Sequence, residues 1–317
     1  MSTLPRLAVV TPSYNTGRHI GAAIRSVLDQ DYADFDYLVM DGGSTDNTVE
    51  VLKSFGNRLR WVSQKDNGQA DAIRRGFQQT TGEILTWLNS DDTYAPGAFR
   101  AIAEFFAANP DVSLVYGNAD YTDADGSLIS PCIHVEPYKP QRLFYYSDYI
   151  VQPAAFFRRS AYEAVGGVDP SLHFAMDYDL WIKIARRFKV AYLPRHLADF
   201  RWLYDNKTAT GGVRRLDEIR TLAARQGFPE PAFTRLERVN LHCRDALNHL
   251  AGGRIRRGIG ALSRAVSDTL SHPRAMWSIV QPHTWRIIWT GQVLRARAAR
   301  AQARAATEPP RVTSAPA

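Results

Sequence analysis

Two adjacent aspartates, Asp91 and Asp92, directly follow an apolar segment at residues 84–88 that has the composition of a buried strand. Carboxylates are poor strand formers, and they are costly to bury unless a charged group binds them. Carboxylate oxygens are the ligands that hard divalent cations prefer, and such a cation can hold a diphosphate in turn. Aspartate also suits the N-cap region of a helix that begins near Pro96, so this pair alone leaves both interpretations open.

Two further acidic segments occur at comparable positions in the chain. Asp41-Gly42-Gly43-Ser44 follows another strand-like segment, and on its own it would indicate a plain turn. Asp177 and Asp179 flank Tyr178 where a helix is expected to begin. Either carboxylate there complements the helix dipole, or one of them faces a substrate hydroxyl and acts as a general base.

The first 120 residues alternate between strand-like and helix-like segments. Strands are predicted at residues 7–11, 37–40, 59–62, 84–88 and 113–116, with helices at 19–28, after 45, at 70–79 and at 96–108. This alternation predicts an α/β fold with a mainly parallel sheet and helices on both faces. Because ligands bind at the carboxyl ends of such strands, the polar segments after Thr11, Met40 and Leu88 should meet there.

The pattern changes beyond residue 120. Hairpin-like pieces come first, then helices near 160–165 and 177–188, a strand at 190–193, and mostly helix after Gly211-Gly212. These glycines are the best candidate boundary. The chain is therefore predicted to have a first domain at 1–210, a helical, arginine-rich region at 211–306 and a disordered tail at 307–317.

The composition is that of a globular protein. The 317 residues are 45% apolar and 22% charged, which excludes collagen, coiled coil and wholesale disorder. Cys132 and Cys243 are too few for a disulfide framework or a thiolate metal cluster. The first residues lack the apolar stretch of a signal peptide, and no apolar run is long enough for a transmembrane helix. We therefore expect a cytoplasmic protein.

The charge is unevenly distributed. Residues 1–210 carry 21 Lys and Arg against 25 Asp and Glu, whereas residues 211–317 carry 18 Arg against 7 acidic residues. After Pro282, Trp285, Ile288, Trp289 and Val293 fall on one helical face. Tryptophan and arginine with little acid are typical of a helix in a membrane interface. We expect this region to bind an anionic membrane surface, peripherally on the inner face of the cytoplasmic membrane.

Two other interpretations of the basic region remain open. Its apolar face packs on the first domain and leaves the arginines in solvent, or the arginines bind nucleic acid. No nucleic-acid-binding motif is visible, and the tryptophans are not spaced like a base-stacking platform. We therefore expect no nucleic-acid partner.

Five segments in order resemble the family 2 glycosyltransferases of the GT-A fold. They are Thr11-Pro12-Ser13-Tyr14-Asn15, Asp41-Gly42-Gly43-Ser44-Thr45-Asp46, Lys65-Asp66-Asn67-Gly68-Gln69-Ala70-Asp71-Ala72, Trp87-Leu88-Asn89-Ser90-Asp91-Asp92 and Met176-Asp177-Tyr178-Asp179-Leu180-Trp181. The resemblance extends over about residues 6–208 and leaves out the C-terminal third. It implies a GT-A domain and an inverting transferase of the bacterial polysaccharide or cell-envelope type.

The resemblance also implies a role for individual residues. The nucleotide-sugar donor would be bound by Thr11, Tyr14, Asn15, Asp41, Gly68, Asp71, Arg75, Asp91, Arg201 and Lys207. Asp41 would accept from the N3–H of uracil or thymine, and Asp91 would bind the ribose. Asp92 would hold Mg²⁺ or Mn²⁺, and Asp177, rather than Asp179, would be the catalytic base. Arg201, Lys207 and Thr208 would belong to a flexible segment that closes over the diphosphate.

Two positions depart from the family pattern. Asn89 stands where many relatives have an acid, which leaves fewer carboxylates near the metal. Leu203 stands where many have a histidine two residues after the arginine that matches Arg201. If that histidine serves the metal or the phosphates in relatives, this chain manages without it.

The function expected from the sequence is transfer of a sugar from a UDP- or dTDP-linked donor to a hydroxyl of a lipid-linked or polysaccharide acceptor. A single displacement needs one carboxylate base and a neutralised diphosphate, with no protein nucleophile. A sugar nucleotidyltransferase is the alternative among enzymes, although the segment after the first strand lacks its glycine-rich, basic signature. A GT-A scaffold without activity is the alternative outside enzymes, and the joint presence of Asp41, Asp92 and Asp177 argues against it.

Overall fold

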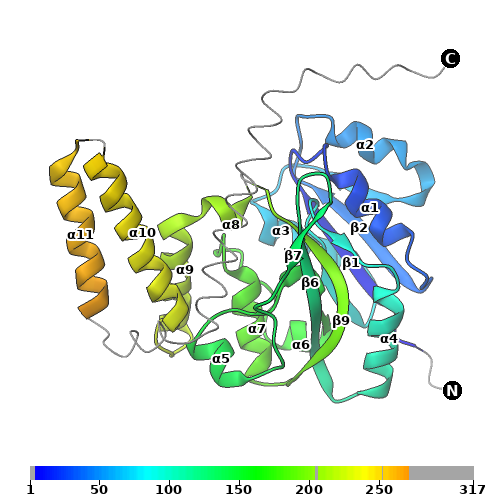
Figure 1. The fold of residues 1–317 in the computed structure, drawn as a ribbon. Helices are drawn as coiled ribbons and strands as arrows, with labels where there is room; N and C mark the ends of the chain where they lie inside the picture. The colour runs from blue at the N-terminus through cyan, green and yellow to red at the C-terminus, as the bar shows by residue number, and fades with distance from the viewer. Residues whose placement is uncertain (1–3, 204–205, 252, 271–317) are drawn as a thin grey trace.

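The structure is a computed structural model, and it describes residues 4–203, 206–251 and 253–270. Its centre is one nine-stranded sheet with the strand order β3-β2-β1-β4-β8-β6-β9-β5, and β7 pairs with β6 outside this path (Figure 1). The strands are β1 (Leu7–Ser13), β2 (Phe35–Asp41), β3 (Arg60–Ser63), β4 (Ile84–Trp87), β5 (Thr93–Tyr94), β6 (Val112–Thr122), β7 (Leu128–Pro131), β8 (Ala155–Arg158) and β9 (Lys189–Arg201).

The sheet is mixed, so the prediction of a mainly parallel sheet holds for only one half of it. β3, β2, β1 and β4 are parallel neighbours, as the early strand–helix alternation predicts. β8 then runs antiparallel to both β4 and β6, and β5 runs antiparallel to β9. β6 and β9 are parallel again, because a long connection separates them, whereas the short β6–β7 hairpin joins antiparallel neighbours.

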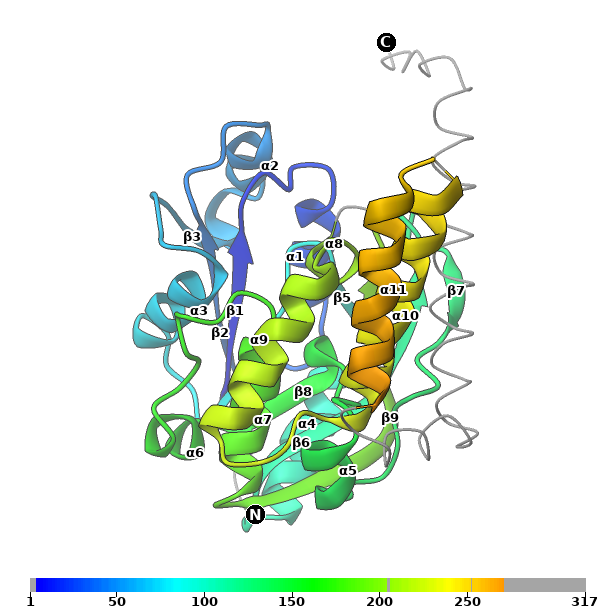
Figure 2. The same ribbon diagram turned by 90° about the vertical axis from the view of Figure 1, so that its left-hand side faces the viewer.

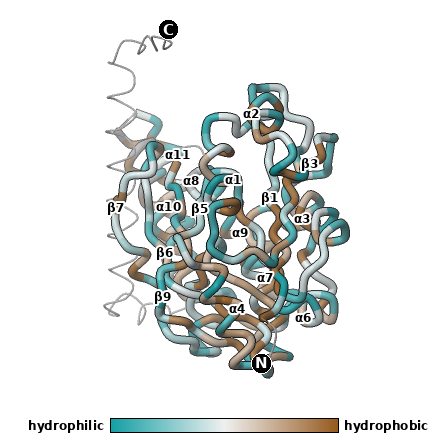
Figure 3. Tube along the Cα trace, turned by 90° about the vertical axis from the view of Figure 1, so that its right-hand side faces the viewer, coloured by the Kyte–Doolittle hydropathy of each residue, from teal (hydrophilic) through white to brown (hydrophobic). Residues whose placement is uncertain are grey.

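Helices cover both faces of the sheet, as predicted. Alternation along β1 sends Leu7 and Val9 into one apolar layer and Ala8 and Val10 into the other. The first layer contains α1 (Ile20–Leu28), α2 (Thr48–Ser54) and α4 (Ala98–Ala108). The second contains α3 (Gln69–Gln78), α5 (Pro140–Tyr145), α6 (Arg159–Ala164), α7 (Met176–Ala185) and α9 (Gly212–Arg225). Figure 3 shows brown, apolar stretches where α4 and α7 meet the sheet.

Helix α9 belongs to the same compact body as the sheet although it lies beyond the predicted boundary at residue 211. Ile219 and Leu222 are buried in the same apolar layer as α3 and α7. Glu218 accepts from the backbone N–H groups of His173, Phe174 and Ala175, which lead into α7. Two of the three distances are 2.8 and 2.7 Å, to His173 and Ala175. Packing and capping therefore extend the compact body through α9.

The helices α10 (Ala232–Ala251) and α11 (Ile255–Leu270) form a hairpin beside α9 at one side of the body (Figures 1 and 2). Among the described residues, no helix is both long and apolar enough to cross a bilayer. The predicted interfacial helix around Trp285 and the predicted tail at 307–317 lie outside the described residues.

Candidate active site

A cleft of about 730 Å³ opens at the carboxyl ends of the parallel strands. Segments from far apart in the sequence line it: the loops after β1, β2, β3 and β4, the start of α7, and the segment around the short helix α8 (Lys207–Thr210). This is the place that the strand pattern predicts for a ligand. Of the residues expected to act there, the lining includes Tyr14, Gly68, Asp91, Asp92, Asp177, Lys207 and Thr208.

Asp92 lies on the cleft wall just after β4 and is only 1% exposed. Its Oδ1 accepts from the backbone N–H of Arg201 at 2.9 Å, and its Oδ2 accepts from the side-chain amide of Asn89 at 3.1 Å. Burial, together with the charge of Asp91, raises the pKa of Asp92 well above its usual range. The two hydrogen bonds leave lone pairs on both oxygens and leave much of the negative charge uncompensated.

Arg201 holds this acidic loop in place and is not among the residues that line the cleft, so its role at the diphosphate stays a prediction. Its Nε donates to the carbonyl of Asp91 at 2.8 Å, and its Nη1 donates to the carbonyls of Asp123 and Ala124. The side chain is buried, because the end of β9 packs between the two loops. A guanidinium that is occupied by backbone carbonyls serves positioning.

Asp177 begins α7 and lines the cleft, whereas Asp179 points into the protein. Asp177 accepts from the backbone N–H of Tyr178 at 2.8 Å, and burial raises the pKa of its carboxyl group. Asp179 is 3% exposed, pairs with Lys183 at 2.7 Å and accepts from Gln226. The geometry therefore offers Asp177 to a ligand and gives Asp179 a structural role.

Asp148 is a second carboxyl group with a perturbed pKa beside Asp177. Its pKa is raised well above the usual range by burial first and by the charge of Asp177 second. The cations of Lys207 and Arg215 partly oppose the rise at Asp177. Nothing in the residue pattern around position 148 pointed to this carboxyl group.

Among the residues of the loops after β1, β2 and β3 that are expected to bind the donor, Tyr14 and Gly68 line the cleft. Tyr14 is 61% exposed, so its ring is free to stack on a flat ligand. Gly68 precedes α3 with φ at +105°, a conformation that favours glycine and lets the backbone approach a ligand closely.

Thr11, Asn15 and Asp41 instead shape the loops behind the cleft. Thr11 is fully buried, and its hydroxyl bonds that of Tyr37 at 3.0 Å. Asn15 accepts from the backbone of Thr45 at 2.8 Å, which ties the loop after β1 to the loop after β2. Asp41 accepts from Ser44 and Ser63 and is 2% exposed. None of the three lines the cleft in the structure.

Asp71 and Arg75 pair with each other on α3, with 3.8 Å between Nη1 of Arg75 and Oδ2 of Asp71. Asp71 also accepts from the backbone N–H of Asn67 at 3.1 Å, which fixes the turn that precedes the helix. Neither side chain lines the cleft. The structure thus gives this pair a role in holding the Gly68 turn.

Several lining residues were not identified from the sequence. Gln69 begins α3, Gln152 lies in a short 3₁₀ turn before β8, His173 lies in the loop before α7, and Phe200 lies on β9. Gln69 lies inside the motif at residues 65–72, and this was the one sequence signal that could have identified it as a site residue. Burial and the nearby Lys207 cation lower the pKa of His173, so its imidazole is neutral at pH 7.

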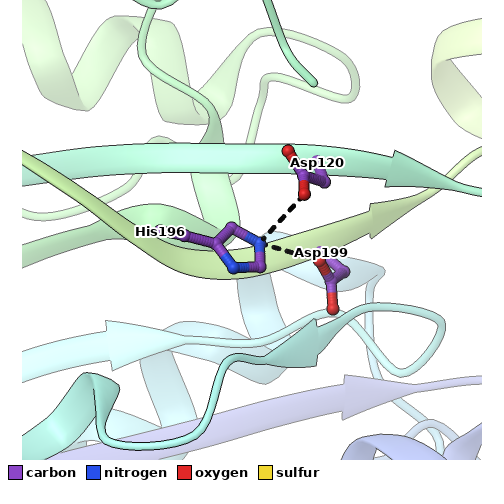
Figure 4. A group of neighbouring side chains, drawn as sticks. All are labelled: Asp120, His196 and Asp199. Carbon is purple, nitrogen blue, oxygen red and sulfur yellow. Dashed lines mark hydrogen bonds and ion pairs between the residues drawn. The ribbon is translucent and has the colours of Figure 1, made fainter. Parts of the chain in front are cut away.

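A separate group of possible cation ligands lies on β6 and β9. Asp120, His196 and Asp199 place their ligand atoms within 4.8 Å of one another (Figure 4). His196 Nε2 lies 2.9 Å from Asp199 and 3.6 Å from Asp120, and the hydrogen bond to Asp199 raises the pKa of the imidazole. None of these residues lines the cleft, and ion pairing alone accounts for their arrangement.

The residues present at Asp92 fit a divalent cation. A buried carboxylate with a strongly raised pKa, free lone pairs and an adjacent aspartate is the environment that a cation stabilises. Asn89 turns its amide nitrogen toward Asp92, and its amide oxygen accepts from Gln69 at 2.6 Å. Asp92 and Asp91 are therefore the residues that would hold a metal ion in the cleft.

The curled mixed sheet, with the acidic loop after β4 and the cleft at the ends of its parallel strands, is the GT-A glycosyltransferase fold. Residues 8–166 match the model of the family described as "Glycosyl transferase family 2". The chain belongs to this family and is a glycosyltransferase. The predicted fold, family and enzyme class are confirmed.

Curated relatives agree with this assignment. The chain is 28% identical over 188 residues to a chondroitin synthase of Escherichia coli, which covers 58% of this chain and 27% of that protein. It is 27% identical over 198 residues to a hyaluronan synthase of Pasteurella multocida, covering 62% and 20%. An uncharacterized glycosyltransferase of Rickettsia typhi is 25% identical over 230 residues, covering 69% of this chain and 70% of that one.

Solved structures share the fold at low sequence identity. A mannosyltransferase from Pyrobaculum calidifontis, in complex with GDP-Man and Mn²⁺, has a TM-score of 0.56 at 20% identity and covers 97% of this chain and 89% of its own. Residues 1–349 of S. aureus TarS, in complex with UDP-GlcNAc, also have a TM-score of 0.56, at 14% identity, covering 87% and 76%.

Proposed function

We propose that this glycosyltransferase moves a sugar from a UDP- or dTDP-linked donor to an acceptor hydroxyl with inversion at the anomeric carbon. The observation that carries the proposal is one cleft lined by Asp177, at the start of α7, and by Asp91 and Asp92, in the loop after β4. A base for the acceptor and an anionic pair suited to a metal–diphosphate unit are the two parts that a single displacement needs.

In this reaction the acceptor oxygen forms a bond to the anomeric carbon while the bond from that carbon to the diphosphate oxygen breaks. The proton of the acceptor hydroxyl passes to the Asp177 carboxylate. Burial raises the pKa of Asp177, which brings it closer to neutral pH and makes the carboxylate a better base. Attack from the side opposite the leaving group inverts the configuration.

The leaving diphosphate gathers negative charge that the cleft must offset. Lys207 lines the cleft and supplies a cation there. A Mg²⁺ or Mn²⁺ ion, when bound by Asp92 with Asp91 beside it, supplies Lewis-acid stabilisation of the diphosphate. Asp92 and Asp91 would hold that ion, and Arg201 fixes both residues through contacts with the Asp92 carboxylate and the Asp91 carbonyl.

The donor and acceptor classes follow from the cleft and from the relatives. The exposed Tyr14 ring at the cleft offers a stacking surface for a base. Relatives named for chondroitin and hyaluronan synthesis support a glycan acceptor, either a polysaccharide or a lipid-linked sugar of the cell envelope. Family membership favours glycosyl transfer over the nucleotidyltransferase alternative.

A panel of nucleotide sugars tests the proposed function. We expect slow hydrolysis of one UDP- or dTDP-sugar, dependent on Mn²⁺ or Mg²⁺ and abolished by chelator, with release of the nucleoside diphosphate. Release of pyrophosphate from a nucleoside triphosphate, as a sugar phosphate is converted to a nucleotide sugar, would instead identify a nucleotidyltransferase. Absence of donor binding across the whole panel would indicate the scaffold alternative.

We also propose that the α10–α11 hairpin rests on an anionic membrane surface on the cytoplasmic side. Ile255, Ile259, Leu262 and Val266 recur at helical spacing on α11 and are each 49% to 62% exposed. Ten arginines and one acid, Asp268, occur between residues 252 and 306. Exposed large apolar side chains within such a basic segment are complementary to an anionic interface.

Vesicle binding of the full-length protein tests the hairpin surface. Replacing Ile259 and Leu262 with serine should weaken binding to phosphatidylglycerol-containing vesicles roughly 10-fold or more, because each apolar side chain contributes about 1 kcal/mol or more at the interface. Binding should also weaken at high salt, since screening removes the contribution of the arginines.

The matched control for this assay is Leu128→Ser, which removes a side chain that is 61% exposed on β7, away from the hairpin. It should leave vesicle binding unchanged. Full-length protein that stays in the supernatant at low salt, or equal losses in the control and the hairpin variant, would contradict the membrane proposal.

A further inference from the structure

A directed chain of hydrogen bonds crosses the cleft from Lys207 to Asp92. The Lys207 ammonium group donates to Gln69 Oε1 at 2.7 Å, and Gln69 Nε2 donates to Asn89 Oδ1 at 2.6 Å. Asn89 Nδ2 then donates to Asp92 Oδ2 at 3.1 Å. A cation at one end is thus joined to a carboxylate at the other through two side-chain amides.

Every bond in this chain points the same way, and this direction has a physical consequence. An amide whose oxygen accepts from a cation becomes a better donor through its nitrogen, so successive bonds strengthen one another. The cationic end at Lys207 therefore strengthens the donation from Asn89 to Asp92.

A side branch holds the central amide in place. Asn89 Nδ2 also donates to Gln152 Oε1 at 2.9 Å, and Gln152 Nε2 donates to the carbonyl of Trp87 at 2.7 Å. Gln152 is 7% exposed, so it is packed from all sides. The branch links the amide of Asn89 to the backbone of β4, the strand that leads into the loop containing Asp92.

We infer that Gln69 and Asn89 are positioning residues that couple the position of Lys207 to the metal affinity of Asp92. The inference rests on the proposed function of Asp92 as the metal ligand. It also gives a role to Asn89, the departure from the family pattern: a carboxylate at this position has no proton to donate to Asp92.

The coupling has a use in the reaction cycle. Lys207 lies beside Thr208 on the cleft lining, where a donor diphosphate would compete with Gln69 for the ammonium group. When the Lys207 ammonium group exchanges between Gln69 and a diphosphate, binding of the diphosphate changes the affinity of Asp92 for the metal ion. The metal ion changes the affinity for the diphosphate by the same factor. Metal loading at Asp92 and phosphate capture by Lys207 then become linked events.

A double-mutant cycle on the full-length protein tests the coupling, with Mn²⁺ binding measured by calorimetry in the absence of nucleotide. We expect Lys207→Met to weaken Mn²⁺ binding roughly 3- to 10-fold, less than the roughly 10- to 100-fold typical of a direct partner of a metal ligand. Gln69→Leu should weaken it by a similar factor. The double variant should be no weaker than either single variant, because both substitutions break the same chain.

The sign of the Lys207 effect separates this mechanism from simple charge repulsion. A lysine that acts only through space repels the ion, so its removal would tighten Mn²⁺ binding. Gln78→Leu, at an exposed position of the same helix α3, and Lys53→Met, at the exposed end of α2, are the matched controls and should leave binding unchanged. Tighter binding in Lys207→Met, or factors that multiply in the double variant, would overturn the coupling.

Asp92→Asn, measured in the same assay, distinguishes failure of the coupling from failure of the proposed metal role. If Asp92→Asn abolishes Mn²⁺ binding while the two other substitutions act independently, only the coupling is wrong. If the wild-type protein binds no Mn²⁺, or binds it unchanged in Asp92→Asn, the metal role of Asp92 is wrong and the coupling falls with it.

Discussion

Replacing Asp177 with asparagine should lower turnover roughly 100-fold or more, because the amide keeps the shape and the hydrogen bonding of the side chain but cannot accept a proton. Donor binding should change little, since Asp177 faces the acceptor in the proposed reaction. Steady-state rates with the active nucleotide sugar, together with calorimetric titration of the nucleoside diphosphate, separate the two quantities. Loss of donor binding in parallel with turnover would contradict the assignment of Asp177 as the base.

The raised pKa of Asp177 sets the direction of two pH effects. Only the ionised carboxylate accepts the proton, so the acidic limb of kcat/KM should lie above about pH 3.9, where an ordinary aspartate titrates. The folded-state pKa is raised above the unfolded value, so ionisation costs stability: the cost is absent below the unfolded pKa and complete above the folded one. Asp177→Asn should therefore melt at the same temperature as wild type at neutral pH, or higher.

Asp179→Asn is the matched control, because it makes the same chemical change two residues away in the same helix. Asp179 is buried against Lys183 and Gln226, so losing its charge should lower the melting temperature and leave the rate per folded molecule nearly unchanged. If Asp179→Asn is instead the variant with the large catalytic loss at unchanged stability, the base has been assigned to the wrong carboxylate.

The features of this site that were predictable from the sequence are those that depend on the residues within a single strand, helix or loop. Asp91 and Asp92 follow a buried strand and Asp177 begins a helix, so strand and helix patterns alone bring these carboxylates toward one sheet edge. The parallel direction of the strands in that half also follows from the alternation of strands and helices. The GT-A fold and the family could be inferred from the resemblance of five sequence segments to that family.

What could not be predicted depends on contacts between distant segments. Arg201 donates to the carbonyls of Asp91, Asp123 and Ala124. The spacing of residues in the sequence does not show that its guanidinium group will bind backbone carbonyls and not line the cleft. Gln152 lies 63 residues from its partner Asn89. Likewise, Glu218 reaches the start of α7 from beyond the glycine pair that looks like a boundary.

Removing the carboxylate of Asp92 should abolish metal-dependent turnover. Metal stabilisation of a leaving group is worth several kcal/mol, so a loss of roughly 1000-fold is expected for Asp92→Ala. Asp92→Asn is the second variant to test, because it retains one acceptor for Arg201 or Asn89 while losing the charge. Since burial and Asp91 raise the pKa of Asp92, neutralising it should not lower the melting temperature of the metal-free protein.

The second group of possible ligands provides the decisive control. Asp120→Asn makes the same change on β6, where Asp120, His196 and Asp199 lie close enough to share an ion. If the catalytic ion binds at Asp92, the Asp120 variant keeps the wild-type dependence of rate on Mn²⁺ concentration, and Mn²⁺ still raises its affinity for the nucleoside diphosphate. If Asp120→Asn removes that dependence while Asp92→Asn retains it, the ion belongs to the cluster of Asp120, His196 and Asp199, and the cleft carboxylates act without it.

If Asp92 binds the metal and Asp177 accepts the proton, the Asp92 and Asp177 variants should lose different properties. The Asp92 variant would lose both its metal response and the gain in nucleotide affinity that the metal gives. The Asp177 variant would keep both and lose the rate alone.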